Sequence, residues 1–235
     1  MRKSLVVVDD FYADLDAVRE HAFARRWYAP YVETGPRPLW LATRHTAPED
    51  CPFKSSAALV ERLEELTGDL VDLDDWKAVY PTDGNGRAVV PRAGRPAGTL
   101  WNCAFHFKPE WNHQRLGEGV HNHVTDDWNG VGQDGWVGLV YLDPRAPLEG
   151  GLKTFRNVDP AHDLDWMTPA ENWELVDSLG NVPNRLILHR GDRPHSGSAG
   201  WGRVMQEGRL YQTFFFKVLP ARHPASLGLP LGGSA

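Results

Sequence analysis

The residues with the clearest potential for chemistry are histidines, because the chain has ten of them and only two cysteines. His121 and His123 flank Asn122 in a short stretch typical of a strand. Side chains two apart on a strand project to the same face, so both imidazoles could reach one ion. Cys51 and Cys103 are too few for an all-cysteine zinc site or an iron–sulfur cluster. A bound metal is therefore expected on imidazole and carboxylate ligands, which suit iron, zinc, copper or nickel.

Three more histidines occur in or just after apolar stretches. His195 follows the stretch 185–189 and the glycine turn at its end. We expect His189, within that stretch, to pack in its strand rather than to bind metal. His106 alternates with Asn102 on the more polar face of another predicted strand. That face is expected either to line a pocket or to hold a satisfied core histidine.

An arginine opens the last apolar stretch of the chain. Alternation along 209–218 places Arg209, Tyr211 and Thr213 on one face, together with Phe215. A guanidinium can bind a carboxylate through two parallel hydrogen bonds, so Arg209 is a candidate for holding a ligand carboxylate. Tyr211 and Thr213 are candidates for binding the same cofactor from the same face.

Together these clusters resemble the iron(II)/2-oxoglutarate oxygenase superfamily. The resemblance covers about residues 99–218 and implies a double-stranded β-helix, that is, a jelly-roll barrel with iron at one open end. It further implies His121 and His195 as metal ligands and Arg209 as the partner of the distal carboxylate of 2-oxoglutarate. The segments that carry it are His121-x-His123, 136–142 with Gly150-Gly151, 184–197 and 208–216, with Gln114-Arg115 as a weaker point.

The chain departs from the family pattern at one position. Where the family has H-x-D or H-x-E, this sequence has His123. If His123 coordinates, three neutral imidazoles leave the ion its full double positive charge, and copper, zinc or nickel become alternatives to iron(II). If His123 swings away, the vacancy could take a halide. In a third alternative, Asp126 or Asp127 supplies the missing carboxylate from a turn.

The resemblance implies a non-haem oxygenase that oxidises a small or medium organic substrate, with O2 and 2-oxoglutarate, in a biosynthetic role. One alternative is a three-histidine metal oxygenase that is independent of 2-oxoglutarate. Another is a non-catalytic binding protein on the same scaffold. The substrate and the oligomeric state do not follow from the sequence.

The elements that must position these residues fall into two groups. The N-terminal part predicts helices at 15–22 and 56–67, where apolar side chains recur at three- and four-residue steps. Asp14 is placed to cap the first helix and Gly68 to end the second. A helical part followed by strands without regular alternation favours an antiparallel sandwich or barrel. Strands are predicted at 5–8, 100–107, 120–124, 136–142, 152–155, 185–189 and 209–218.

The overall prediction is a mainly β fold with flanking helices, a jelly-roll (cupin-like) barrel, in a single domain over 1–219. Its helical part is 1–98, its β-barrel core is 99–219, and a loose tail follows at 220–235. Loops 81–98, 124–135 and 157–184 are expected around the pocket mouth. Trp128, Trp136 and Trp201 lie near the motifs and are candidates for shaping the pocket.

Charge and hydropathy exclude several other classes of function. Lys and Arg number 25 against 31 Asp and Glu, a net charge of -6, and no basic run stands out. Binding to nucleic acid or to an anionic membrane is therefore not expected. The apolar run 5–8 is too short for a signal peptide, and no stretch approaches the roughly 18 apolar residues of a membrane span. A cytoplasmic location is expected.

Overall fold

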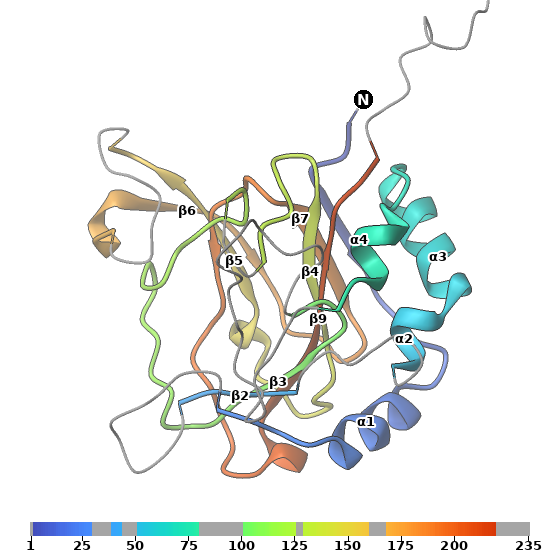
Figure 1. Ribbon diagram of the computed structural model, residues 1–235. Coiled ribbons are helices and arrows are strands. Elements are labelled where there is room, and N and C mark those ends of the chain that lie inside the picture. Colours follow the sequence, from blue (N-terminus) through green and yellow to red (C-terminus); the bar gives the residue numbers. More distant parts are fainter. Residues whose placement is uncertain are drawn as a thin grey trace, which may run out of the picture.

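Two antiparallel sheets form the framework of the protein (Figure 1). The computed structural model describes residues 2–29, 39–43, 51–79, 101–125, 129–159 and 168–219. Within these ranges the larger sheet has the strand order β1 (Leu5–Val8), β7 (Leu186–Arg190), β4 (Trp136–Tyr141), β9 (Arg209–Phe216), β3 (Phe105–Lys108) and β2 (Leu41–Ala42). The smaller sheet has the order β6 (Trp173–Leu179), β5 (Leu152–Asn157) and β8 (His195–Ser196).

The order in which the chain visits the sheets identifies the fold. The chain runs through β4 in the larger sheet, β5 and β6 in the smaller, then β7, β8 and β9 in alternate sheets. An isolated antiparallel bridge between His121 and His195 extends the smaller sheet beyond β8. This winding of two facing antiparallel sheets is that of a double-stranded β-helix. The prediction of a mainly β jelly roll with N-terminal helices is confirmed.

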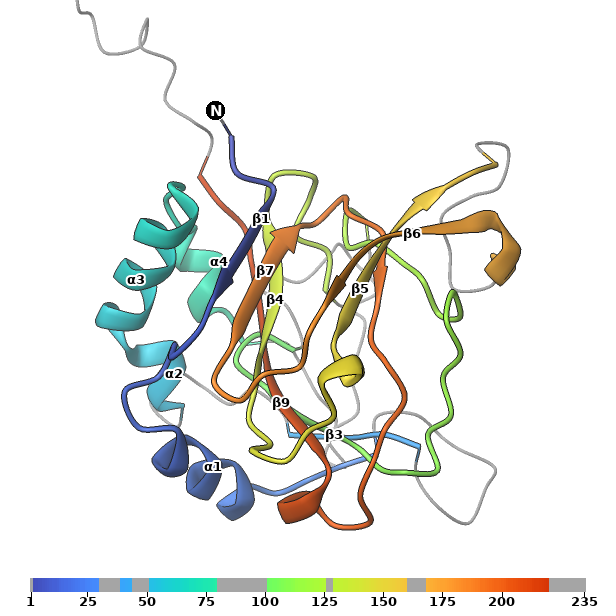
Figure 2. The same ribbon diagram turned by 180° about the vertical axis from the view of Figure 1, so that it is seen from behind.

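Helices cover the outer face of the larger sheet. In the described residues these are α1 (Leu15–Ala24), α2 (Pro52–Ser55), α3 (Ala57–Thr67) and α4 (Leu73–Lys77), and they lie together on one side of the molecule (Figures 1 and 2). Leu63 of α3 and Trp76 of α4 are fully buried against Phe214 and Phe216 of β9. Burying such large apolar side chains stabilises this layer and fixes β9 beneath it.

Local sequence signals set the ends of the two longer helices. The Asp14 side chain accepts a hydrogen bond from the Ala17 amide at the start of α1, and Ser56 does the same for Leu59 at the start of α3. α3 ends at Gly68, whose φ of +78° lies in the left-handed region that glycine adopts without strain. The predicted cap at Asp14 and the predicted stop at Gly68 are confirmed.

Several predicted boundaries are wrong. Residues 122–125 bend instead of continuing a strand, so only the bridge at His121 stands where a strand over 120–124 was predicted. Strand β3 begins at Phe105 rather than at residue 100, because 101–103 form a turn in which Cys103 has φ +62°. The predicted loop 157–184 contains β6, whose mostly exposed side chains lack a clear half-buried pattern.

Some predictions fall on other parts of the chain. Loop 81–98, Asp126, Asp127, Trp128 and the tail 220–235 lie outside the described residues. The single-domain assignment stays a prediction. Among the residues that the structure describes, every helix is too short or too polar to span a membrane.

Candidate functional site

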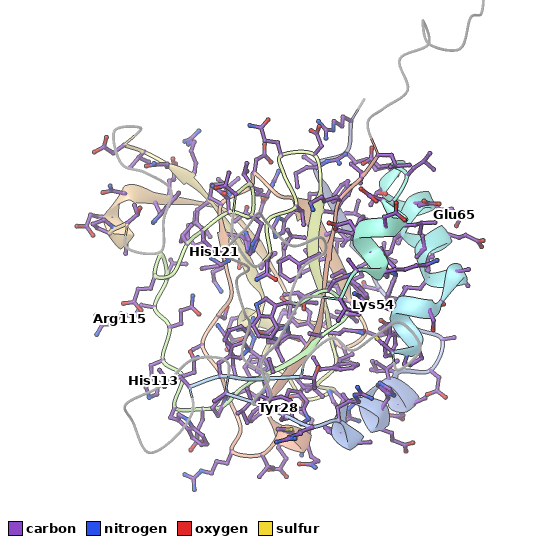
Figure 3. The ribbon with its side chains drawn as sticks, viewed as in Figure 1. Tyr28, Lys54, Glu65, His113, Arg115 and His121 are labelled. Carbon is purple, nitrogen blue, oxygen red and sulfur yellow. The ribbon has the colours of Figure 1, made fainter. Side chains whose placement is uncertain are left out.

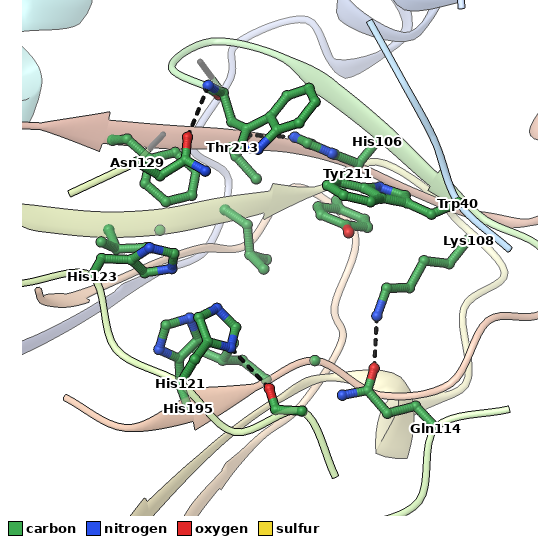
Figure 4. Close-up of a pocket in the computed structure, with 18 of the residues that line it drawn as sticks. Trp40, His106, Lys108, Gln114, His121, His123, Asn129, His195, Tyr211 and Thr213 are labelled. Carbon is green, nitrogen blue, oxygen red and sulfur yellow. Dashed lines mark hydrogen bonds between the residues drawn. The ribbon is translucent and has the colours of Figure 1, made fainter. Parts of the chain in front are cut away.

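The interior of the barrel holds a cavity of about 700 Å³ between the two sheets (Figure 4). Its wall comes from both sheets, including Val137 of β4, His189 of β7 and Arg209 of β9 from the larger and Leu152 of β5 from the smaller. A cavity of this size accommodates a drug-sized ligand. The predicted histidines and the predicted face of β9 both line it.

Three histidines gather at one end of this cavity. His121, His123 and His195 each offer a ring nitrogen, and these three atoms all lie within 4.8 Å of one another. Their ring centroids are 4.5 to 5.1 Å apart. In Figure 3 His121 lies nearer the middle of the molecule than the exposed His113 and Arg115. The structure thus brings together the three histidines that the sequence singled out.

Backbone hydrogen bonds hold the three histidines in place. The amide of His121 donates to the carbonyl of His195 at 3.1 Å, and the amide of His195 donates back at 2.9 Å. The amide of His123 donates to the carbonyl of Gly191 at 2.7 Å. Two segments far apart in the sequence are therefore joined directly at the cluster.

Hydrogen bonds to backbone carbonyls orient two of the imidazoles. Nδ1 of His121 lies 2.8 Å from the carbonyl oxygen of Gly119, and Nδ1 of His195 lies 3.0 Å from that of Arg193. A carbonyl oxygen can only accept, so Nδ1 carries the proton in each ring and Nε2 keeps its lone pair. This is the orientation that outer hydrogen bonds give to metal-binding histidines.

Burial favours the neutral form of two histidines at this end of the cavity. Burial, and then the neighbouring His189, His121 and His123, lower the pKa of His195 well below its usual value. Burial likewise lowers the pKa of His189 to about 3. Neutral imidazoles carry the lone pairs that a metal ion requires.

The donor set fits a divalent transition metal. Within the described residues, no carboxylate joins the three histidines to make a larger cluster. Three imidazole nitrogens suit iron, copper, nickel or zinc. The geometry has His123 beside the other two rather than swung away, and Asp126 and Asp127 lie outside the described residues. The role of the three histidines as ligands stays a prediction.

His189 lies closer to this cluster than the sequence indicated. Its ring centroid is 4.1 Å from that of His195, and it lines the cavity. Its Nδ1 donates to the carbonyl of Arg190 at 2.9 Å. His189 packs in its strand as predicted, and its ring also packs against that of His195.

The predicted face of β9 lines the cavity along its whole length. Arg209, Tyr211, Thr213 and Phe215 all belong to the wall, as alternation along the strand requires. The Phe215 ring lies 5.0 Å from that of His123, which places one end of β9 at the histidines. The strand therefore spans the distance between the histidine end and the position of Arg209.

Arg209 is a buried cation at the cavity wall. Only 1% of it is exposed, and its guanidinium donates to the carbonyl of Ser198. A Cβ on Gly197 would lie 3.2 Å from both Nη atoms, so a side chain there would displace the guanidinium by a few tenths of an ångström. The Tyr141 hydroxyl is buried near Arg209, whose charge acts on it. Burial raises the pKa of Tyr141 to about 12, so this hydroxyl stays a donor.

Thr213 links two parts of the cavity wall through hydrogen bonds of its hydroxyl group. Its hydroxyl donates to the carbonyl of Trp101 at 2.7 Å and accepts from Nε2 of His106 at 2.8 Å. The His106 ring lies between those of Trp40 and Tyr211, at 5.1 and 5.2 Å and nearly parallel to both. Burial lowers the pKa of His106 to about 3, so this stack is neutral. Cofactor binding by Tyr211 and Thr213 stays a prediction.

The tryptophans of the wall differ from those expected. Trp136 is fully buried in the core beside the helices, where its Nε1 donates to Asp69, and it does not line the cavity. Trp201 lies beside Arg209, 5.7 Å from the guanidinium. The wall instead contains Trp40 and Trp101. Neither carries a motif in the sequence that would have identified it.

Lys108 is the wall residue that sequence reasoning missed most clearly. It lies directly opposite Arg209 in the pairing of β3 with β9, and its Nζ donates to Oε1 of Gln114 at 2.8 Å. Figure 4 shows this pair across the cavity from the three histidines. The alternation that links Asn102 and His106 continues to Lys108, so the signal was present one residue beyond the predicted strand.

Comparisons with known proteins give a distant structural likeness. No protein-family model matches the chain, and no curated protein matches it. Among solved structures, a similar chain is a prolyl hydroxylase from Trichoplax adhaerens in complex with a hypoxia inducible factor oxygen degradation domain peptide fragment. The two are 15% identical, with a TM-score of 0.43, over 91% of this chain and 83% of that one. Nothing about the chemistry of this chain follows from so distant a likeness.

Proposed function

We propose that the protein is a metal-dependent oxygenase that oxidises a small or medium organic substrate with O2 and 2-oxoglutarate. One observation carries the proposal: a cluster of three histidines and a buried arginine line the same cavity. The first is suited to a divalent metal and the second to a carboxylate. A 2-oxo acid with a distal carboxylate has a group for each.

In this proposal the histidines and Arg209 of the cavity wall have separate roles. His121, His123 and His195 would hold the metal, and hydrogen bonds to backbone carbonyls orient the rings of His121 and His195. A bound iron(II) ion would supply the activation of O2 coupled to the oxidative decarboxylation of 2-oxoglutarate. Arg209 would bind the distal carboxylate and thereby orient the 2-oxo group toward the histidines.

The aromatic side chains of the wall would provide an apolar environment for the substrate. Trp40, Trp101 and Phe215 contribute apolar surface to the cavity, and a ligand that covers this surface would displace water from it. Excluding water strengthens every electrostatic contact of the bound ligands. It also favours an organic substrate with apolar surface over a highly charged one.

A second function is favoured by the missing carboxylate. Within the described residues the histidine cluster contains no acidic side chain, so the metal would keep its double positive charge. Such a metal would be a stronger Lewis acid than one with a carboxylate ligand, and it could bind an anionic substrate directly. The alternative is therefore a three-histidine oxygenase that does not use 2-oxoglutarate.

The test begins with protein purified without chelators. Elemental analysis should find one transition-metal ion per chain, and succinate should form from 2-oxoglutarate under air in an iron-dependent reaction. Metal binding without any binding or turnover of 2-oxoglutarate would favour the second function. No metal at the histidines despite added iron(II) would contradict both.

The variant His123→Asp separates the roles of the third ligand. If His123 occupies the coordination position of the carboxylate, aspartate there should retain the metal and restore or raise the turnover of 2-oxoglutarate. The variant His113→Asp, at an exposed histidine outside the cavity, is the matched control and should change neither quantity. A loss of metal in His123→Asp would contradict this role.

A further inference from the structure

The end of the cavity opposite the histidines contains a second cation that the proposed function does not yet use. Lys108 closes β3 and Arg209 opens β9, and the two residues are direct partners in the register of the sheet. Both line the cavity. Directly opposed residues of an antiparallel pair have Cβ atoms about 5 Å apart, so two positive charges start from adjacent positions on one wall.

Neither charge is balanced within the described part of the chain. The Lys108 ammonium donates to the neutral amide oxygen of Gln114. The Arg209 guanidinium donates to the carbonyl of Ser198 and interacts with the neutral Tyr141 hydroxyl. The Nε of Arg209 is buried without a hydrogen-bond partner among these residues. Two like charges cost free energy at such a position unless an anion joins them.

The lowered pKa of Lys108 agrees with this arrangement. Burial, and then the nearby charge of Arg209, lower the pKa of Lys108 to about 7. The charged groups that act on it include no acid. A bound carboxylate would restore the ammonium form by supplying the missing opposite charge.

A nearby lysine, Lys153, differs from Lys108 because its ammonium makes two hydrogen bonds within the protein. Lys153 of β5 also senses the charge of Arg209, but its Nζ donates to the carbonyl of Glu149 at 3.0 Å and to Oγ of Ser198 at 2.7 Å. It does not line the cavity. The difference marks Lys108 as the lysine placed for a ligand.

We propose that Lys108 and Arg209 form a two-cation subsite for the distal carboxylate of the 2-oxo acid co-substrate, with Lys108 as its specificity-determining residue. The inference rests on the proposed function. It assigns to Lys108 the selection of a dicarboxylate over a 2-oxo acid that ends in an apolar group. Gln114 holds the ammonium toward the cavity when the subsite is empty.

The test measures the binding of two ligands to Mn(II)-loaded protein by isothermal titration calorimetry. 2-Oxoglutarate has the distal carboxylate, and 2-oxobutyrate has the same 2-oxo acid group without it. Lys108→Met should weaken 2-oxoglutarate binding about ten- to hundredfold, as expected for a lost charged hydrogen bond. It should leave 2-oxobutyrate binding unchanged. Lys108→Arg should retain the preference for 2-oxoglutarate, and the control Lys153→Met should bind both ligands as the natural protein does.

The pH profile gives a readout that a purely structural role would not change. The natural protein should bind 2-oxoglutarate ever more weakly as the pH rises above about 7, because Lys108 loses its proton in the free protein. Lys108→Met and Lys108→Arg should lack this loss. Lys108→Met should also unfold at a higher temperature, because it removes a poorly solvated cation, whereas a structural role predicts a lower one.

The outcomes separate the two proposals. If the natural protein binds Mn(II) but not 2-oxoglutarate, the 2-oxoglutarate function fails and this inference fails with it. If the natural protein binds 2-oxoglutarate and Lys108→Met binds it equally well, only the assignment of Lys108 is overturned. Equal weakening of both ligands, or an equal effect of Lys153→Met, would also overturn it.

Discussion

The two ends of the cavity are built from opposite electrostatic principles. At one end, three imidazoles lie within reach of a common centre, and burial keeps His195 neutral. At the other end, Lys108 and Arg209 lie side by side without a carboxylate partner in the described residues. The first end offers imidazole nitrogens to a cation, whereas the second has two neighbouring cationic side chains. This difference is the basis of the proposed ligand set, a metal cation at one end of β9 and a carboxylate at the other.

β9 makes this comparison possible because its two faces do different work. Phe214 and Phe216 anchor the strand beneath the helices, where Trp76 packs against them. Arg209 and Phe215, on the other face, mark the two ends of the cavity. A rigid strand can thus hold both subsites at a fixed separation.

The largest expected effect comes from removing a ligand at the neutral end. His195→Ala should weaken the binding of iron(II) or cobalt(II) by well over about a hundredfold, because even residues that only support a ligand contribute ten- to hundredfold. Equilibrium dialysis measures the affinity. His113→Ala, at an exposed histidine outside the cavity, should bind the metal normally. Equal affinities for His195→Ala and the natural protein would refute the neutral end as the metal site.

Removing the cation at the other end should have the next largest effect. Arg209→Met should weaken 2-oxoglutarate binding about ten- to hundredfold while leaving the metal affinity unchanged, because the charge it removes lies at the end of the cavity away from the three histidines. Calorimetry on Mn(II)-loaded protein measures both quantities. Arg203→Met, at an exposed arginine paired with Glu110, is the control. Loss of metal in Arg209→Met would show that the two ends are not independent.

The wall between the two ends should respond to acid. His106 has a pKa of about 3 in the folded protein, below its unfolded value of about 6.5, so the unfolded chain binds more protons between these values. His106 should therefore contribute a loss in the free energy of unfolding of up to about 1.4 kcal/mol per pH unit as the pH falls through this window. Urea unfolding at several pH values measures this slope.

The variant His106→Phe keeps an aromatic ring between Trp40 and Tyr211 but cannot take a proton. Its slope should be smaller than that of the natural protein, whereas His113→Phe should show the natural slope. An unchanged slope in His106→Phe would contradict a neutral wall.

The smallest effect should come from a single added methyl group. Gly197→Ala places a Cβ about 3.2 Å from both Nη atoms of Arg209, so the guanidinium must shift by a few tenths of an ångström. A cost of about 1 kcal/mol corresponds to about fivefold weaker binding of 2-oxoglutarate. Calorimetry should detect this change without any change in metal affinity. Unaltered 2-oxoglutarate binding would show that Arg209 has more freedom than its contacts indicate.

Sequence reasoning reached those parts of the site that depend on local periodicity. The shared face of His121 and His123 and the cavity face of β9 follow from an alternation of two. The pairing of His121 with His195 does not, because it depends on a bridge between distant segments. The resemblance to an oxygenase family implied both as metal ligands but not the hydrogen bonds that join them.

The parts that sequence reasoning missed have physical causes. Lys108 was lost because the predicted strand ended at residue 107, one position before the strand does. β6 was missed because most of its side chains are exposed and give no half-buried pattern. The stack of Trp40, His106 and Tyr211 was missed as well. His106 lies in β3, Tyr211 in β9 and Trp40 just before β2, and contacts between segments so far apart in the sequence produce no local pattern.

The central claim is that one ligand bridges the two ends of the cavity, and coupled binding tests it most directly. The measurement is the affinity of 2-oxoglutarate for the protein with and without Mn(II), in the natural chain and in His195→Ala. The account predicts at least about tenfold tighter binding when the metal is present, and no such gain in His195→Ala. Equal affinities with and without metal in the natural protein would contradict it.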